Sequence, residues 1–153
     1  GNGAQIHVQQ TNGNGTQGVS LAIASLVVTA GTTATIVATY SGALAQVTAN
    51  VYTITGYNSA TPVASSGNEV ASGDPSTTAN VTATGVAVGL WAGTSGTQAG
   101  VTLAGLFTEN YDANSSTSRV ASAHQGGLSA ETPRTFSGTS TMTAETIVAA
   151  TWS

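Results

Sequence analysis

The chain has 153 residues, of which 40% are hydrophobic and only 5% are charged, with a formal net charge of −4 and no cysteine. Two arginines offer no cationic surface for phosphates, which excludes nucleic acid as a partner and disfavours anionic membranes. The lack of cysteine excludes disulfides and thiolate sites, and the longest apolar run, residues 19–28, is too short to span a bilayer.

The first quarter of the chain has the pattern of a hairpin. Ile6 and Val8 flank His7 in a short strand, and the Asn-Gly pairs in 12–15 favour a tight turn. Apolar residues then alternate over 19–23, and the alternation breaks just before residue 26. We therefore expect two strands joined by a turn, with a bulge near the end of the second.

Two further strands are expected before residue 56. Residues 33–40 alternate between Ala, Ile or Tyr on one side and mostly Thr on the other, and Thr is a strand former that suits a solvent face. The next strand places Val47, Ala49 and Val51 inward, with Tyr52 and Ile54 on the opposite face. The sequence thus predicts neutral hydroxyl groups where most proteins use charges.

The rest of the chain is expected to alternate between loops and strands. Residues 58–75 are rich in Ser, Gly and Pro and predict a long connection with a turn at Asp74–Pro75. Trp91 should point away from the strand face of Val86, Val88 and Leu90. Further predicted strands are 101–107, 118–123, 133–142 and 146–152, and the predicted connections are a turn at 94–100 and a polar loop at 109–119.

These segments predict an all-β fold. Gly, Ser, Thr and Asn occur in every window and disfavour helix interiors by up to about 1 kcal/mol each relative to Ala. About eight to ten short strands at this spacing are typical of an antiparallel β-sandwich, of jelly-roll or immunoglobulin-like type. We expect one domain over residues 1–153, as a piece or processed product of a longer chain.

The polar segment 109–114 is the best candidate site. Its carboxylates and amides could hold a calcium ion and its tyrosine could stack on a sugar, but the spacing fits no EF-hand and such residues commonly bond to their own backbone in turns. No catalytic, cofactor-binding or metal-ligating residue is therefore assigned. The expected contacts to a glycan or partner protein are Tyr57, Glu109, Asn110, Tyr111 and Asp112.

Sequence motifs for an enzyme are lacking. His7 and His124 are far apart and neither lies in an HExxH or triad-like context, and there is no Gly-x-Ser-x-Gly motif. A glycosidase needs two carboxylates about 5 to 10 Å apart, and which of the six acids meet in space is open. We predict a non-enzymatic protein and keep a glycan-processing enzyme as the least favoured reading.

Three sequence stretches carry a family resemblance. They are Val51-Tyr52-Thr53-Ile54-Thr55-Gly56 with Ala60-Thr61-Pro62, then Leu106-Phe107-Thr108-Glu109-Asn110-Tyr111-Asp112, then Ala149-Ala150-Thr151-Trp152-Ser153. In this order they resemble a Gly/Ser/Thr/Ala-rich β domain of virion structural proteins from tailed phages, especially those of alphaproteobacteria. The resemblance spans nearly the whole chain.

The resemblance implies a setting and no active site. It implies a fibre, spike or decoration domain at a virion surface or another extracellular location, in contact with other virion proteins or copies of itself. The neutral Thr and Asn faces of the sheets could in addition offer hydrogen bonds to host glycans. One or two strands expected upstream of Gln5 are missing, which suggests either a truncated or cleaved product or an incomplete N-terminal edge that a neighbouring chain completes. A self-assembling filament or surface-layer subunit of a cell is the alternative.

Overall fold

The computed structural model describes residues 4–13, 17–29, 35–96, 100–105, 108–115 and 117–153. Across these ranges the structure has ten strands, all paired antiparallel, and no helix. In these described ranges there is therefore no helix long and apolar enough to cross a membrane. The predicted all-β, antiparallel class is confirmed.

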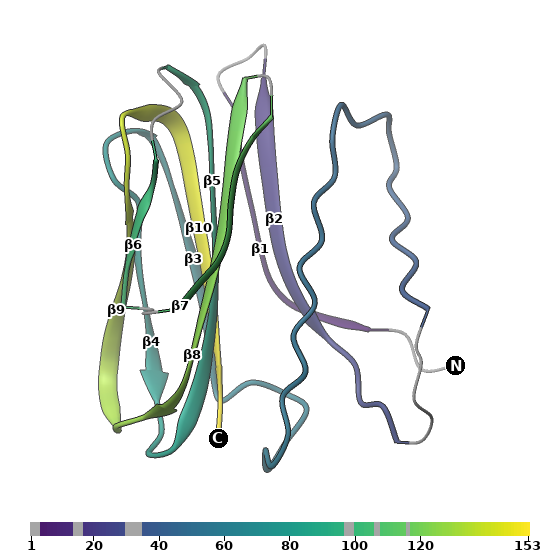
Figure 1. Ribbon diagram of the computed structural model, residues 1–153, viewed down its shortest axis with the longest axis vertical. Coiled ribbons are helices and arrows are strands. Elements are labelled where there is room, and N and C mark those ends of the chain that lie inside the picture. Colours follow the sequence, from purple (N-terminus) through teal and green to yellow (C-terminus); the bar gives the residue numbers. More distant parts are fainter. Residues whose placement is uncertain (1–3, 14–16, 30–34, 97–99, 106–107, 116) are drawn as a thin grey trace.

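A five-stranded sheet lies at the centre of the structure and is flanked by two smaller sheets (Figure 1). Its strands are, in spatial order, β3 (Ala64–Ser72), β10 (Met142–Trp152), β5 (Gly85–Gly96), β8 (Ser118–Leu128) and β7 (Thr108–Ser115). The second sheet contains β4 (Ser76–Val81), β9 (Glu131–Thr139) and β6 (Thr102–Ala104), and the third is the hairpin of β1 (Gln5–Gly13) and β2 (Gly18–Ser25).

The five-stranded and three-stranded sheets form a β-sandwich. Trp91 of β5 and Phe136 of β9 are fully buried in the apolar core between them, together with alanines from β8. Trp91 points away from Val88 and Leu90, as predicted, because those two side chains belong to a second core on the other face of the sheet. Whether the connectivity is of jelly-roll or immunoglobulin-like type stays a prediction.

The second core explains the sequence of β10. The β1–β2 hairpin covers the outer face of the central sheet with Val19, Leu21 and Ile23. Residues of β10 therefore alternate between two cores, with Ile147 facing the sandwich interior and Val148 facing the hairpin. A strand buried on both faces shows a continuous apolar run and no apolar–polar alternation.

Two predicted loops are strands. Residues 64–72, inside the expected long connection, form the edge strand β3, and Thr108–Ser115, inside the expected polar loop, forms the opposite edge strand β7. Edge strands are often polar because one side of the strand meets solvent. Their Ser, Asn and Gly residues therefore predicted loops wrongly, whereas the turn at Asp74–Pro75 between β3 and β4 is confirmed.

Two predicted strands are not strands. Residues 35–40 and 47–54 form no ladder, and Val47 and Val51 are 50% and 68% exposed. Tyr52 and Ile54 are the inward residues, because they pack against the core between the hairpin and the central sheet. The side of this segment that was predicted to face inward is therefore the exposed one. Thr33 and Ala34 lie outside the described residues, as do parts of the predicted turn 94–100 and strand 101–107.

The remaining differences concern strand ends. The bulge expected near Ser25 lies across the hairpin at His7, between the pairs Ile6–Ala24 and Val8–Ile23. The strand predicted over 101–107 comprises only Thr102–Ala104 in the described part of that range. Strands expected at 118–123, 133–142 and 146–152 are confirmed with shifted ends, because pairing partners set where a strand stops.

One segment stands apart from the layers. Every residue from 35 to 47, called here the exposed arm, is solvent-exposed. Figure 1 shows it on the side of the hairpin away from the central sheet. The chain rejoins the body at Tyr52 and is then tied to the end of β10, where Asn58 N donates to Ser153 O and Val63 N donates to Thr151 O.

Candidate functional site

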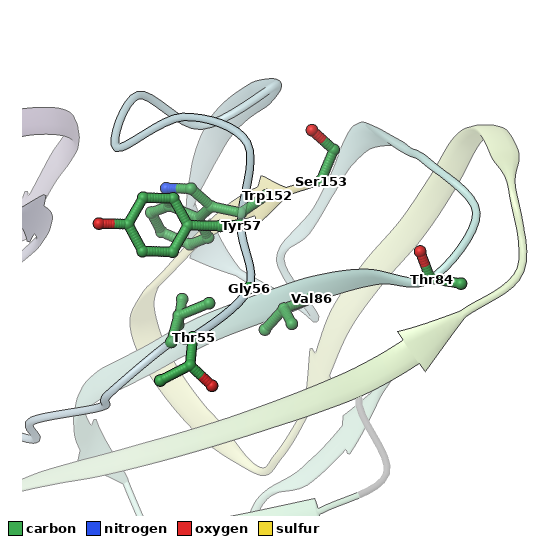
Figure 2. A pocket seen from close by; sticks show the side chains of 8 residues that line it. Thr55, Gly56, Tyr57, Thr84, Val86, Trp152 and Ser153 are labelled. Atoms are coloured by element: carbon green, nitrogen blue, oxygen red, sulfur yellow. The ribbon is translucent and has the colours of Figure 1, made fainter.

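Tyr57 lines a small pocket at the end of β10 (Figure 2). Trp152, Thr84 and Val86 form other parts of its wall, and its volume is about 40 Å³. Ligand pockets usually measure about 300–1,000 Å³, so this one is too small to enclose a sugar ring. Trp152 is only 5% exposed and donates its Nε1–H to Ala60 O at 3.0 Å, which makes it a core residue.

The other four predicted contact residues lie on β7. Glu109 and Asn110 are exposed, whereas Tyr111 and Asp112 are half-buried. In the central sheet β5 and β8 separate β7 from β10, so the structure does not bring Tyr57 together with these four. The segment is a paired edge strand with a bulge between Glu109 and Tyr111.

Asp112 is held in an ion pair. Arg119, on the neighbouring strand β8, donates from Nε to Oδ1 and from Nη2 to Oδ2 of Asp112, each at 2.5 Å, and from Nη1 to Asn114 Oδ1 at 2.7 Å. The hydrogen bond to Asp112 is the largest cause that raises the pKa of Arg119. Both carboxylate oxygens are thus occupied, which leaves Asp112 poorly suited to bind a cation.

Asn110 belongs to a polar row on the opposite face of the sheet. Its Oδ1 lies 2.6 Å from His124 Nδ1, and the His124 ring lies 5.5 Å from the ring of Tyr52. Tyr52 in turn donates its hydroxyl to Ser122 Oγ at 3.0 Å. This row ties Tyr52, in the segment that follows the exposed arm, to β8, a contact that sequence alone did not indicate.

Glu145 is the most unusual ionisable group in the described structure. It is fully buried, and it accepts hydrogen bonds from Trp91 Nε1 at 3.1 Å and from Ser140 Oγ at 2.9 Å. Burial disfavours the carboxylate and raises its pKa, while the hydrogen bonds from Ser140 and Trp91 oppose the shift and the charge of Asp74 adds to it.

A bulge in β10 directs Glu145 inward. Thr143 pairs with Thr94 and Thr146 pairs with Ala92, so two residues of β10 oppose Gly93 alone. Ala144, the first of the two, has a φ of 49°, which an alanine adopts at a cost of about 1–2 kcal/mol. In the sequence Glu145 is one of six acids. Its position shortly before the apolar run 147–150 was the available signal.

The described ionisable groups do not form a reactive cluster. His7 Nε2 is hydrogen-bonded to Ser25 Oγ at 2.7 Å near the chain end, and its pKa is lowered because it is partly buried. Glu131 accepts from Arg134 Nη1 at 2.5 Å. Among the residues that the structure describes, no three His, Asp or Glu side chains gather as a metal site would require.

Comparison of the chain with protein-family models, with curated protein sequences and with solved structures found no significant match.

Proposed function

We propose that the chain is a non-enzymatic structural subunit on the exterior of a phage particle, serving as a fibre, spike or decoration domain. The resemblance of three sequence stretches to virion structural proteins supports the location. The observation that carries the non-enzymatic part is the use of three of its six carboxylates as internal ties. Asp112 is held by Arg119, Glu131 by Arg134, and Glu145 is enclosed beside Trp91. Groups held in this way stabilise a scaffold and are poorly placed to exchange protons with a substrate.

The small number and low exposure of its trypsin sites support an exterior location. Trypsin cleaves after Arg and Lys, and the chain contains two arginines and no lysine. Arg119 and Arg134 both lie in paired strands, and their side chains are only 13% and 10% exposed in their ion pairs. Because cleavage requires an extended, unpaired substrate segment, the folded chain should resist trypsin until it unfolds.

The location is tested on particles from the native source. Particles purified by density gradient are analysed by quantitative mass spectrometry and labelled with a gold-conjugated antibody raised against the folded chain. We expect many copies per particle and gold on the particle surface. A protein that stays in the soluble fraction, or is present at far less than one copy per particle, contradicts the proposal.

Host glycan contact is proposed as a secondary, weak function. Tyr57 is half-buried in the wall of the pocket at the end of β10, and its aromatic ring is the surface on which one face of a sugar could stack. A glycan array should show binding that Tyr57→Ala removes and Tyr57→Phe retains, because the ring supplies the stacking surface. Equal binding by both variants would place the contact elsewhere, with Tyr111 the next residue to test.

A filament or surface-layer subunit of a cell is the second candidate. The exposed arm favours it as much as it favours a phage particle, because both roles need contacts between copies. The same antibody decides between them: gold on the surface of uninfected cells supports the alternative. For the glycan-processing reading, Glu109→Gln and Asp112→Asn should leave any turnover of host polysaccharide unchanged.

A further inference from the structure

The exposed arm carries large apolar side chains in contact with solvent. Ile36 is 65% exposed, Val37 81%, Tyr40 50%, Leu44 52% and Val47 50%. With about 150–200 Å² for each fully exposed residue, these five present roughly 500 Å², more than half of the approximately 800 Å² that one partner contributes to a standard interface. A solvent-exposed surface of this kind marks an interaction site.

Among the described residues, the backbone of the arm also has no hydrogen-bond partner. Residues 35–40 have a sequence typical of a strand, yet they form no ladder. The hydrogen bonds between described residues include none to residues 35–51. Extended backbone with free N–H and C=O groups pairs readily with another extended segment.

The distribution of charge indicates what the partner is. All eight charged residues lie at or beyond Glu69, so the first 68 residues contain no Asp, Glu, Lys or Arg. Exposed strands usually carry charges that prevent self-pairing, and this arm has none. It offers no opposite charge to an acidic or basic partner, whereas a second identical arm is equally neutral, apolar and extended.

We propose that the exposed arm pairs with the same arm of a second copy of this chain, with residues 35–40 of the two copies antiparallel around a two-fold axis. Such an interface is self-complementary. The pairing completes the backbone hydrogen bonds of the arm and encloses its apolar side chains. This inference deepens the structural role proposed above and rests on it for the choice of a copy of the chain as partner.

Self-association of the purified full chain tests the proposal. Sedimentation velocity over a concentration series should show a reversible dimer or a larger assembly. Val37→Lys should weaken association about 100-fold, since the two-fold axis places two new charges in one interface and each is expected to cost about tenfold. Ser129→Lys adds the same charge at an exposed turn after β8 and should associate like the wild type. Association that is equal in both variants, or a wild type that is monomeric throughout, overturns the proposal.

A cross-link tests the arm-to-arm geometry. The native chain has no cysteine, so Ala38→Cys provides a single thiol near the proposed axis. Oxidation should give a disulfide-linked dimer with Ala38→Cys and little with Ser129→Cys. Association without this cross-link refutes arm-to-arm pairing. These measurements use purified protein, so their outcome is separate from the particle labelling that tests location: dimers of a protein absent from virions would remove the phage role and keep the arm pairing.

Discussion

The pH dependence of stability should reveal the buried carboxyl group of Glu145. Replacing it with Gln keeps the shape of the side chain. The amide oxygen can accept from Trp91 Nε1, and the amide group can donate to Ser140 Oγ, as a protonated carboxyl would. Glu145→Gln therefore imitates the neutral form of the native residue at every pH.

The sign of the effect follows from the raised pKa. Between the ordinary Glu value of 4.5 and the higher pKa of the folded protein, the native state binds more protons than the unfolded state. Stability of the wild type should therefore fall as pH rises through this window, by up to about 1.4 kcal/mol per pH unit. The amide of Glu145→Gln does not titrate, so the variant should not show this fall in stability. It should therefore become more stable than the wild type as pH rises.

Truncation of Glu145 should behave differently from the amide replacement. Glu145→Ala leaves Trp91 Nε1–H without an acceptor in the core and opens a cavity, with a combined cost of about 3–5 kcal/mol. In a chain of this length that lowers Tm by about 10 °C. The loss should persist at low pH, where the wild-type carboxyl is neutral.

Urea unfolding of the three proteins, followed by tryptophan fluorescence from pH 4 to 8, measures these effects. The lowered pKa of His7 also makes stability depend on pH, because it destabilises the fold as pH falls below 6.5. This contribution is the same in the wild type and in Glu145→Gln, so the difference between their free energies of unfolding isolates the effect of Glu145. Parallel stability profiles for these two proteins would refute the argument. So would a Gln variant as unstable as the Ala variant.

Two further predictions concern packing and charge. At Gly138 an added Cβ would lie 2.3 Å from Trp91 Cδ1, so Gly138→Ala should lower the free energy of unfolding in urea by about 3 kcal/mol. Gly42 has open space around it, so Gly42→Ala is the control and should have no measurable effect. Equal effects of the two substitutions would contradict the packing of Gly138 against Trp91. Asp112→Ala should cost about 1–2 kcal/mol because it leaves the nearly buried Arg119 with fewer partners, and unchanged stability in the same assay would show that the ion pair contributes nothing.

The candidate site could be predicted only in part. Tyr57 and the segment 109–112 are at least partly accessible, yet sequence could not show that they lie on separate parts of the central sheet or that Arg119 occupies Asp112. The inward position of Glu145 depends on a bulge against β5, a contact between residues about 50 positions apart. Such pairings depend on the whole fold, so no local sequence pattern predicts them.

The sequence by itself determined the all-β class, the turn at Asp74–Pro75, and most strands of the second half. These features depend on local properties: β-branched residues and tight-turn residues impose extended backbone and reversals wherever they occur. Only the tertiary structure decided which extended segments become strands. The polar residues 64–72 pair with the free edge of β10. Residues 35–40 have the alternating pattern of a strand but pair with no described strand of their own chain. An extended segment becomes a strand only when a neighbour supplies its hydrogen bonds, and that neighbour is chosen by the packing of the layers.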